Sequence, residues 1–335
     1  MTNPWSWYSD ADLARLEQER IFARTWQYVG HAGQVAAVGD FFTARAGRIP
    51  IVVTHAEDGE ARAFVNVCRH RGSTVAEGAG NRMTLQCPYH AWTYGLDGRL
   101  RAAPRADFDL SELQLAKVRL EPWGPFLFVN PDDDAPSLAE TFGELPAQVA
   151  EILDVDALRF HHRSAWSVEA NWKLVSENFL ECYHCAVAHL GFTELVDVSP
   201  DSYRLEEHRW FSSQFGPARA PTDGDLPRSQ FHFVWPNTGI NIFPGRPNLS
   251  IGPIMPAGPE RTERVLDYFF APGEDETWIA ELLELDDRIG REDSALVERA
   301  QLGVGAGVIE QGRLLGESER LVAHFQSLVR DALSL

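Results

Sequence analysis

Two cysteine–histidine pairs in the first third of the chain constrain its fold more than any other feature. Cys68 and His70 are spaced as C-x-H, and after sixteen further residues Cys87 and His90 are spaced as C-x-x-H. Thiolate and imidazole are the ligands of zinc sites and of some iron–sulfur clusters. One pair alone is common by chance, but both pairs at this spacing predict a metal centre that two loops bind together.

The segment around these pairs reads as a small all-β domain. From about residue 39 to residue 130, short runs rich in β-branched and aromatic residues alternate with Gly, Asn and Asp, which is typical of strands and turns. Further on, helix and strand patterns mix, and the chain reads helical after Pro272. Near the N-terminus, apolar residues three and four apart predict a helix over residues 13–29, with Ser9 or Asp10 as its cap.

Two chemistries fit two cysteines and two histidines. A structural zinc ion would take all four side chains tetrahedrally. A Rieske [2Fe–2S] cluster takes two thiolates on one iron and two imidazoles on the other. Two loops that each present one cysteine and one histidine favour the cluster, because each loop then serves both irons; the zinc site remains the alternative.

A second group of ligand-type residues lies in ENFLECYHCAVAH, residues 177–189. On a helix, Glu181 and His184 share a face, whereas His189 is five residues further on, so the helix must end or distort, for example in a π-type bulge, if both histidines meet one ion. Two imidazoles and one carboxylate form the facial triad of non-haem Fe(II) oxygenases. The alternative is a C-x-x-C site made of Cys182 and Cys185.

Both motifs resemble those of the Rieske non-haem iron oxygenases, the family of ring-hydroxylating α subunits. CRHRG followed by CPYHAW resembles the family's cluster motif, with Gly72 and Pro88 at its turns. The resemblance implies that one iron of the cluster is bound by two cysteines and the other by two histidines. These ligands are Cys68 and Cys87, and His70 and His90.

The segment NWKLVSENFLECYHCAVAH resembles the family's mononuclear iron motif. The resemblance implies that His184 and His189 bind the iron. The third ligand in the family is an aspartate on a late helix, which implies Asp293, with the adjacent Glu292 as the alternative.

Two further residues of this motif receive catalytic roles from the resemblance. The family has an acid before Y-H that connects a catalytic histidine to a cluster histidine of the neighbouring subunit, and that position is Glu181 here. Asn178 stands where the family has an asparagine near the iron. Cys182 and Cys185 are then expected to be small buried side chains rather than ligands, because soft thiolates favour zinc or copper. Few cysteines and a reducing compartment argue against structural disulfides.

The resemblance implies an α+β protein of three parts. Residues 1–37 hold a helix that packs on the catalytic domain, and residues 38–150 form the Rieske β-domain. Residues 151–335 form a catalytic domain with an antiparallel sheet and helices, similar to a helix-grip fold. The implied assembly is a homotrimer arranged head to tail.

Charge and composition limit the classes of binding partner that we expect. The formal charge of −19 disfavours nucleic acid, and no apolar run reaches the length of a membrane span. The N-terminus lacks the pattern of a secretory signal, so we expect a cytoplasmic protein. A dinucleotide fingerprint is also lacking, which implies that electrons come from an NAD(P)H-dependent reductase or a ferredoxin.

The expected function is a terminal oxygenase that uses these electrons and O2 to hydroxylate a small organic substrate, with N-dealkylation where the hydroxylated carbon bears nitrogen. The motif E-C-Y-H-C resembles the branch that oxidises choline, glycine betaine and carnitine, which favours a quaternary ammonium substrate. Some aromatic side chains between Trp210 and Phe243 could enclose such a cation. The alternatives are an aromatic-ring hydroxylase or aromatic acid demethylase and, outside the class, a zinc-stabilised binding protein without a redox role.

Overall fold

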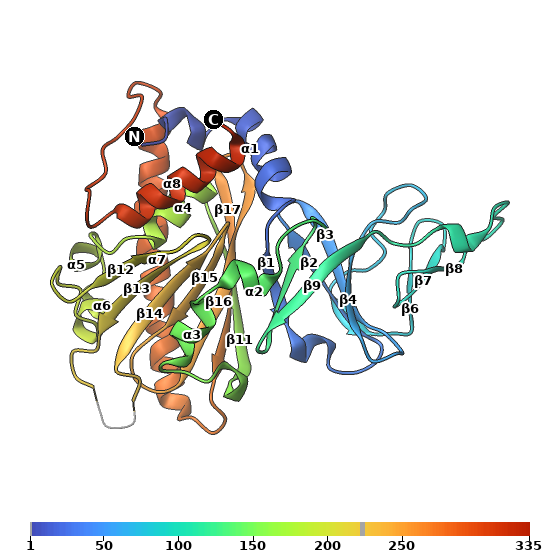
Figure 1. Cartoon of the computed structure of the whole chain (residues 1–335), viewed down its shortest axis with the longest axis horizontal. Coiled ribbons are helices and arrows are strands. Elements are labelled where there is room, and N and C mark those ends of the chain that lie inside the picture. Colours follow the sequence, from blue (N-terminus) through green and yellow to red (C-terminus); the bar gives the residue numbers. More distant parts are fainter. Residues whose placement is uncertain (1, 222–224) are drawn as a thin grey trace. The chain divides into compact units, whose positions relative to one another are not determined.

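The fold is described from a computed structural model, which covers residues 2–221 and 225–335. Contacts divide the chain into two compact units, which are coloured along the sequence in Figure 1. We call Phe22–Leu138 the β-unit, and the residues up to Ile21 together with Ala139–Leu335 the α+β unit. The divisions therefore fall after residues 21 and 138, whereas the sequence suggested residues 37 and 150.

The β-unit contains a seven-stranded antiparallel sheet in the order β1-β10-β9-β4-β3-β2-β5 and a three-stranded sheet in the order β6-β7-β8. The strands are β1 Gln27–His31, β2 Asp40–Ala46, β3 Ile49–His55, β4 Ala61–Val65, β5 Ala79–Asn81, β6 Thr84–Gln86, β7 Thr93–Gly95, β8 Leu100–Ala102, β9 Lys117–Trp123 and β10 Phe126–Asn130. Short 3-10 turns lie at Ala32–Val35 and Leu110–Glu112.

The expected helix over residues 13–29 is wrong in its second half. Helix α1 covers Ala11–Glu17, capped by Asp10 as expected, and a single π-turn follows at Gln18–Phe22. Strand β1 then begins at Gln27, and all of its residues are buried. A strand buried on both faces loses the alternating pattern that would distinguish it from a helix, so periodicity alone misassigns it.

The large sheet of the β-unit separates two apolar clusters, because neighbouring side chains of a strand point to opposite faces. Phe41, Val52 and Phe64 lie in one cluster, together with the thiols of Cys68 and Cys87. The other cluster takes the alternate positions of the same strands. The loop after β4 and the loop between β6 and β7 therefore both carry a cysteine into one core.

The α+β unit is built on a second seven-stranded antiparallel sheet, in the order β11-β17-β16-β15-β14-β13-β12. Its strands are β11 Arg159–Val168, β12 Arg204–Glu207, β13 Phe211–Pro217, β14 Arg228–Val234, β15 Thr238–Ile242, β16 Asn248–Gly258 and β17 Arg261–Phe270. Its helices are α2 Leu138–Phe142, α3 Leu145–Ala150, α4 Trp172–Phe179, α5 Cys185–Ala188, α6 Leu190–Leu195, α7 Glu276–Gly305 and α8 Arg320–Leu333, with 3-10 turns at Trp5–Tyr8 and Val155–Ala157. The expected α+β class is confirmed.

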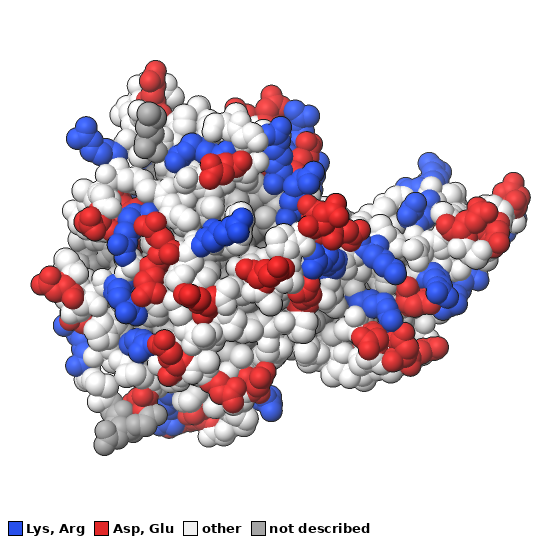
Figure 2. Space-filling model, in the orientation of Figure 1, with Lys and Arg blue, Asp and Glu red and all other residues white. Residues whose placement is uncertain are grey.

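Helix α4 occupies the centre of this unit, since it contacts β16, β17 and the long helix α7. Asn171 caps α4 and Asp275 caps α7, each by accepting backbone N–H groups of the first turn. Within the described residues no helix is long and apolar enough to cross a membrane. On the face shown in Figure 2, acidic and basic side chains are interspersed.

A buried ion pair connects α1 to α4. Lys173 and Glu17 have side-chain exposures of 0% and 1%, and the ammonium Nζ lies 2.5 Å from the carboxylate Oε1. The other carboxylate oxygen accepts the indole N–H of Trp172 at 2.7 Å. Each charge therefore has an oppositely charged partner on the other helix, so the pair ties the N-terminal segment to the core of the α+β unit.

We predict that Glu17→Met destabilises the α+β unit by about 3–5 kcal/mol, because it leaves the Lys173 ammonium buried without a counter-ion. The double variant E17M/K173M should recover most of this loss, since no buried charge remains. The exposed pair Asp12–Arg15 on the same helix provides the control, and Asp12→Ala should change stability by less than about 1 kcal/mol. Urea unfolding measures all three; equal losses in the single and double variants would contradict this account.

Glu177, one helical turn after Lys173, has a perturbed acidity. Its Oε1 accepts the hydroxyl of Tyr8 at 2.8 Å and the amide of Gln326 at 3.1 Å. Burial raises the pKa of this carboxyl from its ordinary value to about 7, although both hydrogen bonds oppose the shift. The folded state therefore binds this proton more tightly than the unfolded chain does, and the associated stability is lost as pH rises towards 7.

We predict that Glu177→Gln removes this pH dependence. The unfolding free energy of the variant, relative to the unchanged protein, should increase as pH rises from about 5 to about 8. Denaturant titrations at several pH values measure the difference. A difference that stays constant or decreases with pH would show that the carboxyl is ionised in the folded state throughout this range.

Candidate metal centres and substrate pocket

The two cysteine–histidine loops of the β-unit share one backbone design. The N–H of Cys68 donates to the carbonyl of Ser73, and the N–H of Gly72 donates back to the carbonyl of Cys68. In the second loop the N–H of Cys87 donates to Trp92 and that of Ala91 donates to Cys87, at the same spacings. The structure thus presents both pairs on equivalent tight turns, although the sequence spaces them differently.

Each turn needs a left-handed residue at the same position. Gly72 has φ 75° and Ala91 has φ 58°. Glycine adopts this conformation without strain, whereas a residue with a Cβ does so at some cost. The first loop therefore follows the expected glycine turn, and the second imposes the same geometry on an alanine.

The two cysteines and two histidines differ in their exposure to solvent. Both thiols are buried at 2% exposure, whereas His70 and His90 are exposed with ring centroids 4.6 Å apart. The hydroxyl of Tyr94 lies 3.4 Å from the sulfur of Cys68. Two buried thiols and two outer imidazoles match the donor set of a [2Fe–2S] cluster with a cysteine-bound and a histidine-bound iron.

A single zinc ion fits these donors less well. A tetrahedral site with bonds of about 2.0–2.3 Å brings all four donors within about 4 Å of one another. Among the described residues, the only group of three or more His, Cys, Asp or Glu donors within 4.8 Å of one another is His184, His189 and Asp293. The cysteine and histidine donors of the β-unit are therefore spread wider than one ion requires.

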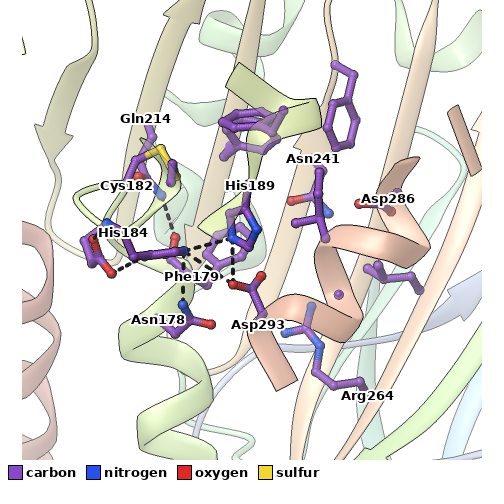
Figure 3. A pocket seen from close by; sticks show the side chains of 18 of the residues that line it. Asn178, Phe179, Cys182, His184, His189, Gln214, Asn241, Arg264, Asp286 and Asp293 are labelled. Atoms are coloured by element: carbon purple, nitrogen blue, oxygen red, sulfur yellow. Dashed lines mark hydrogen bonds and ion pairs between the residues drawn. A yellow bond between two sulfur atoms is a disulfide. The ribbon is translucent and has the colours of Figure 1, made fainter. Parts of the chain in front are cut away.

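His184, His189 and Asp293 converge in the α+β unit (Figure 3). The Nε2 atoms of the two histidines lie 3.1 Å apart, and Oδ1 of Asp293 lies 2.9 Å from Nε2 of His189 and 3.3 Å from Nε2 of His184. Three donors bound at right angles to an ion at about 2.1 Å would lie about 3 Å apart. The trio therefore has the spacing of a facial site that leaves the remaining positions open.

The two histidines, five residues apart, can approach each other because helix α4 ends before them. Helix α4 stops at Phe179, α5 begins only after His184, and His189 lies at the break between α5 and α6 with φ −116° and ψ 67°. No π-bulge is assigned to this segment, residues 177–189. Asp293 comes from the middle of α7, more than a hundred residues further along the chain.

Carboxylates hold the far side of each imidazole. Glu181 accepts a short hydrogen bond from Nδ1 of His184, and Glu292 accepts one from Nδ1 of His189 at 2.8 Å. Such contacts orient the rings and leave both Nε2 atoms for an ion. Glu292, the alternative third ligand, therefore lies behind His189, whereas Asp293 lies in front of it.

The carboxyl of Asp293 is electrostatically prepared to meet a cation. Burial alone would raise its pKa, but hydrogen bonds and charges from His184 and His189 lower it to about 2. The amide Nδ2 of Asn178 lies 3.2 Å from Nε2 of His184, so this expected residue also reaches the trio. All four expected residues of the second motif, together with Asp293, thus meet in one place.

A cavity with about 690 Å³ of empty space, partly open to solvent, lies beside the trio. Of the aromatic residues expected between Trp210 and Phe243, only Phe231 and Phe243 line it; the others pack elsewhere. The full aromatic lining is Trp166, Phe179, Phe192, Tyr203, Phe231 and Phe243.

Several lining residues are absent from the sequence-based expectations. Trp166 and Arg264 face each other on the neighbouring strands β11 and β17, and Asp286 comes from α7. A signal for Arg264 was present, because Arg264, Leu266 and Tyr268 alternate along one strand and therefore share one face. An arginine in phase with apolar residues marks a buried charge.

The expectation that Cys182 and Cys185 are unlinked is wrong in the structure, where a disulfide joins them. The turn that ends α4 places their Cα atoms 4.9 Å apart, within the range for such bonds. A reducing compartment disfavours disulfides in general, but it does not reveal that a turn brings these two cysteines together. Both residues line the cavity, and neither belongs to the trio.

Comparisons with known families agree with these two sites. Residues 155–335 match the ring hydroxylating alpha subunit (catalytic domain), and residues 25–115 match the Rieske [2Fe-2S] domain. The chain is 33% identical to the carnitine monooxygenase oxygenase subunit of Acinetobacter pittii, over 98% of this chain and 94% of that protein. It is 32% identical to chloroplastic choline monooxygenase of Arabidopsis thaliana, over 100% of this chain and 83% of that protein.

Solved structures show the same similarity along the whole chain. The quaternary ammonium Rieske monooxygenase CntA in complex with L-carnitine has a TM-score of 0.86 and 30% identity, covering 99% of this chain and 95% of that one. Naphthalene 1,2-dioxygenase from Rhodococcus, at 20% identity and a TM-score of 0.85, shares the fold. This chain is therefore a member of the Rieske non-haem iron oxygenases, with a [2Fe–2S] domain and a ring-hydroxylating α-subunit catalytic domain that binds mononuclear iron.

Proposed function

We propose that His184, His189 and Asp293 hold the mononuclear iron. The spacing of their donor atoms supports this assignment. Glu181 and Glu292 then keep both Nδ1 atoms protonated, so that Nε2 of each ring is unprotonated and can bind the iron.

For the cluster, we propose Cys68 and Cys87 as ligands of one iron and His70 and His90 as ligands of the other. The buried thiols and exposed imidazoles support this pairing. When bound, the cluster supplies single electrons and the mononuclear iron supplies O2 activation. The cavity beside the trio would receive the substrate, and Asn178 remains within reach of the trio.

The enzyme is a terminal oxygenase that needs a reductase partner, O2 and a small-molecule substrate. We propose NAD(P)H as the ultimate electron donor and a homotrimer as the assembly, both on the strength of the family resemblance. Glu181 is the proposed connection to a cluster histidine of a neighbouring subunit. Its side chain is 13% exposed and already holds His184, which supports a role beside the iron site.

The substrate we propose is a small quaternary ammonium compound. The observation that carries this proposal is the cavity beside the trio, whose wall contains six aromatic side chains. Aromatic faces attract quaternary ammonium groups through cation–π contacts, and they need no hydrogen bond from the ligand. The relatives named for carnitine and choline support the same class.

The proposed reaction balances as one C–H bond, O2, two electrons and two protons giving one C–OH bond and water. If the hydroxylated carbon bears the ammonium nitrogen, the hydroxyl loses its proton and a carbonyl forms. The C–N bond breaks in the same step, and its electron pair leaves with the nitrogen as a neutral tertiary amine.

The assignment of the third ligand can be tested with two neighbouring acids. Asp293→Asn should abolish mononuclear iron binding, because the variant loses the one carboxylate among the described residues that lies near both Nε2 atoms. Glu292→Gln should retain iron with an affinity about 10–100-fold weaker, since it removes only the contact behind His189.

Iron per chain, measured by titration of the metal-free catalytic site while the [2Fe–2S] spectrum is followed separately, gives the readout. The double variant C182S/C185S is the further control and should keep its iron, because neither sulfur belongs to the trio. Equal iron loss in the Glu292 and Asp293 variants, or loss in the cysteine variant, would contradict this ligand set.

The substrate class can be tested with a surrogate reductase. O2 uptake coupled to product formation should occur with betaines or other quaternary ammonium compounds, and should be at least about tenfold slower with aromatic acids of similar size. Mass spectrometry of the products establishes coupling. Coupled turnover of aromatic acids alone would favour the aromatic hydroxylase instead, and colourless protein with stoichiometric zinc would exclude an oxygenase.

A further inference from the structure

Arg264 is a buried cation at the edge of the substrate cavity. It lies on β17 in the register position opposite Trp166 of β11, and only 8% of its surface is exposed. Residues Leu266 and Tyr268 point to the same side of the strand. In Figure 3 its guanidinium extends towards the side of the cavity where Asp293 lies.

No hydrogen bond or ion pair of the Arg264 side chain occurs within residues 2–221 and 225–335. The guanidinium instead makes a cation–π contact with Trp166, whose ring centroid lies 5.6 Å from the guanidinium carbon. Stacking on a ring uses the flat face of the guanidinium and leaves the N–H groups at its edge free to donate. A buried arginine normally has a partner for these donors.

The acids of the same wall already have other partners. Asp286 accepts the hydroxyl of Tyr268 at 2.6 Å. Asp293 faces the two histidines, and an ion at the trio would take up its charge. The charges of both carboxylates act on Arg264 from a distance. Among residues 2–221 and 225–335, however, no carboxylate forms an ion pair with its guanidinium, so its N–H groups lack an anion in direct contact.

We propose that Arg264 binds the carboxylate of the substrate and selects quaternary ammonium carboxylates over the corresponding ammonium alcohols. This inference rests on the proposed function, since the aromatic wall then takes the ammonium end of the same molecule. A guanidinium matches a carboxylate with two parallel N–H···O bonds, and burial strengthens both. The site therefore recognises a zwitterion by its two ends.

Three matched ligands test the inference by calorimetric binding to the iron-loaded enzyme without O2. The first is γ-butyrobetaine. The second is the ammonium alcohol in which a hydroxymethyl group replaces its carboxylate. The third is the alkanoate in which carbon replaces its ammonium nitrogen. We expect the unchanged enzyme to bind γ-butyrobetaine at least about tenfold more tightly than the alcohol.

In Arg264→Gln, affinity for γ-butyrobetaine should fall about 10–100-fold, whereas affinity for the alcohol should stay within about twofold. Arg264→Lys, which keeps the charge but loses the planar fork, should lose less. The control is Arg261→Gln on the same strand, because Arg261 is exposed and lies near Glu169. It should change neither affinity.

The outcomes separate this inference from the proposed function. If the unchanged enzyme binds both ammonium ligands equally, or if Arg264→Gln weakens both to the same extent, the carboxylate role of Arg264 is wrong while the quaternary ammonium class stands. If only the alkanoate binds, and its binding depends on Arg264, the quaternary ammonium class fails while the carboxylate role stands. The comparison of ligands on the unchanged enzyme remains decisive even if an Arg264 variant does not fold.

Discussion

The catalytic unit depends on holding three donor atoms about 3 Å apart although they come from segments distant in the chain. His184 and His189 flank a helix of one turn, and Asp293 lies in the middle of α7. The packing of α4 against α7 brings these segments together, and Glu181 and Glu292 fix the two rings from behind. Without an ion the three groups satisfy one another, since Asp293 lies within hydrogen-bond or ion-pair distance of both histidines.

The sequence predicted the site better than its surroundings, for a physical reason. The motif around His184 and His189 and the family resemblance, which implied Asp293, pointed to these three residues before the fold was known, and the structure brings their side chains together. Glu292 and Asp293 are neighbours in sequence but point to different sides of α7. Which of them faces the two Nε2 atoms depends on how α7 packs. Arg264 was missed because its burial depends on the pairing of β17 with β11. Strand β1 was taken for a helix because burial on both faces removes its periodicity.

The two units use contrasting ways to present metal ligands. In the β-unit, one turn geometry occurs twice, and each turn has a buried thiol and an exposed imidazole. In the α+β unit, the two proposed histidine ligands lie at breaks between short helices and the proposed aspartate lies within the long helix α7. The sheet and α7 both contribute to the cavity wall. Aromatic side chains and Arg264 lie in this wall together, so the proposed recognition of the substrate and the proposed binding of the iron share the same framework.

A crystal structure of the iron-loaded protein with γ-butyrobetaine, with anomalous diffraction at the iron edge, tests this account most directly. We predict one iron peak bounded by His184, His189 and Asp293, with the ligand carboxylate on Arg264 and its ammonium group against the aromatic wall. An iron peak bound by Glu292 or by the cysteines at 182 and 185, or a ligand whose carboxylate points away from Arg264, would contradict it.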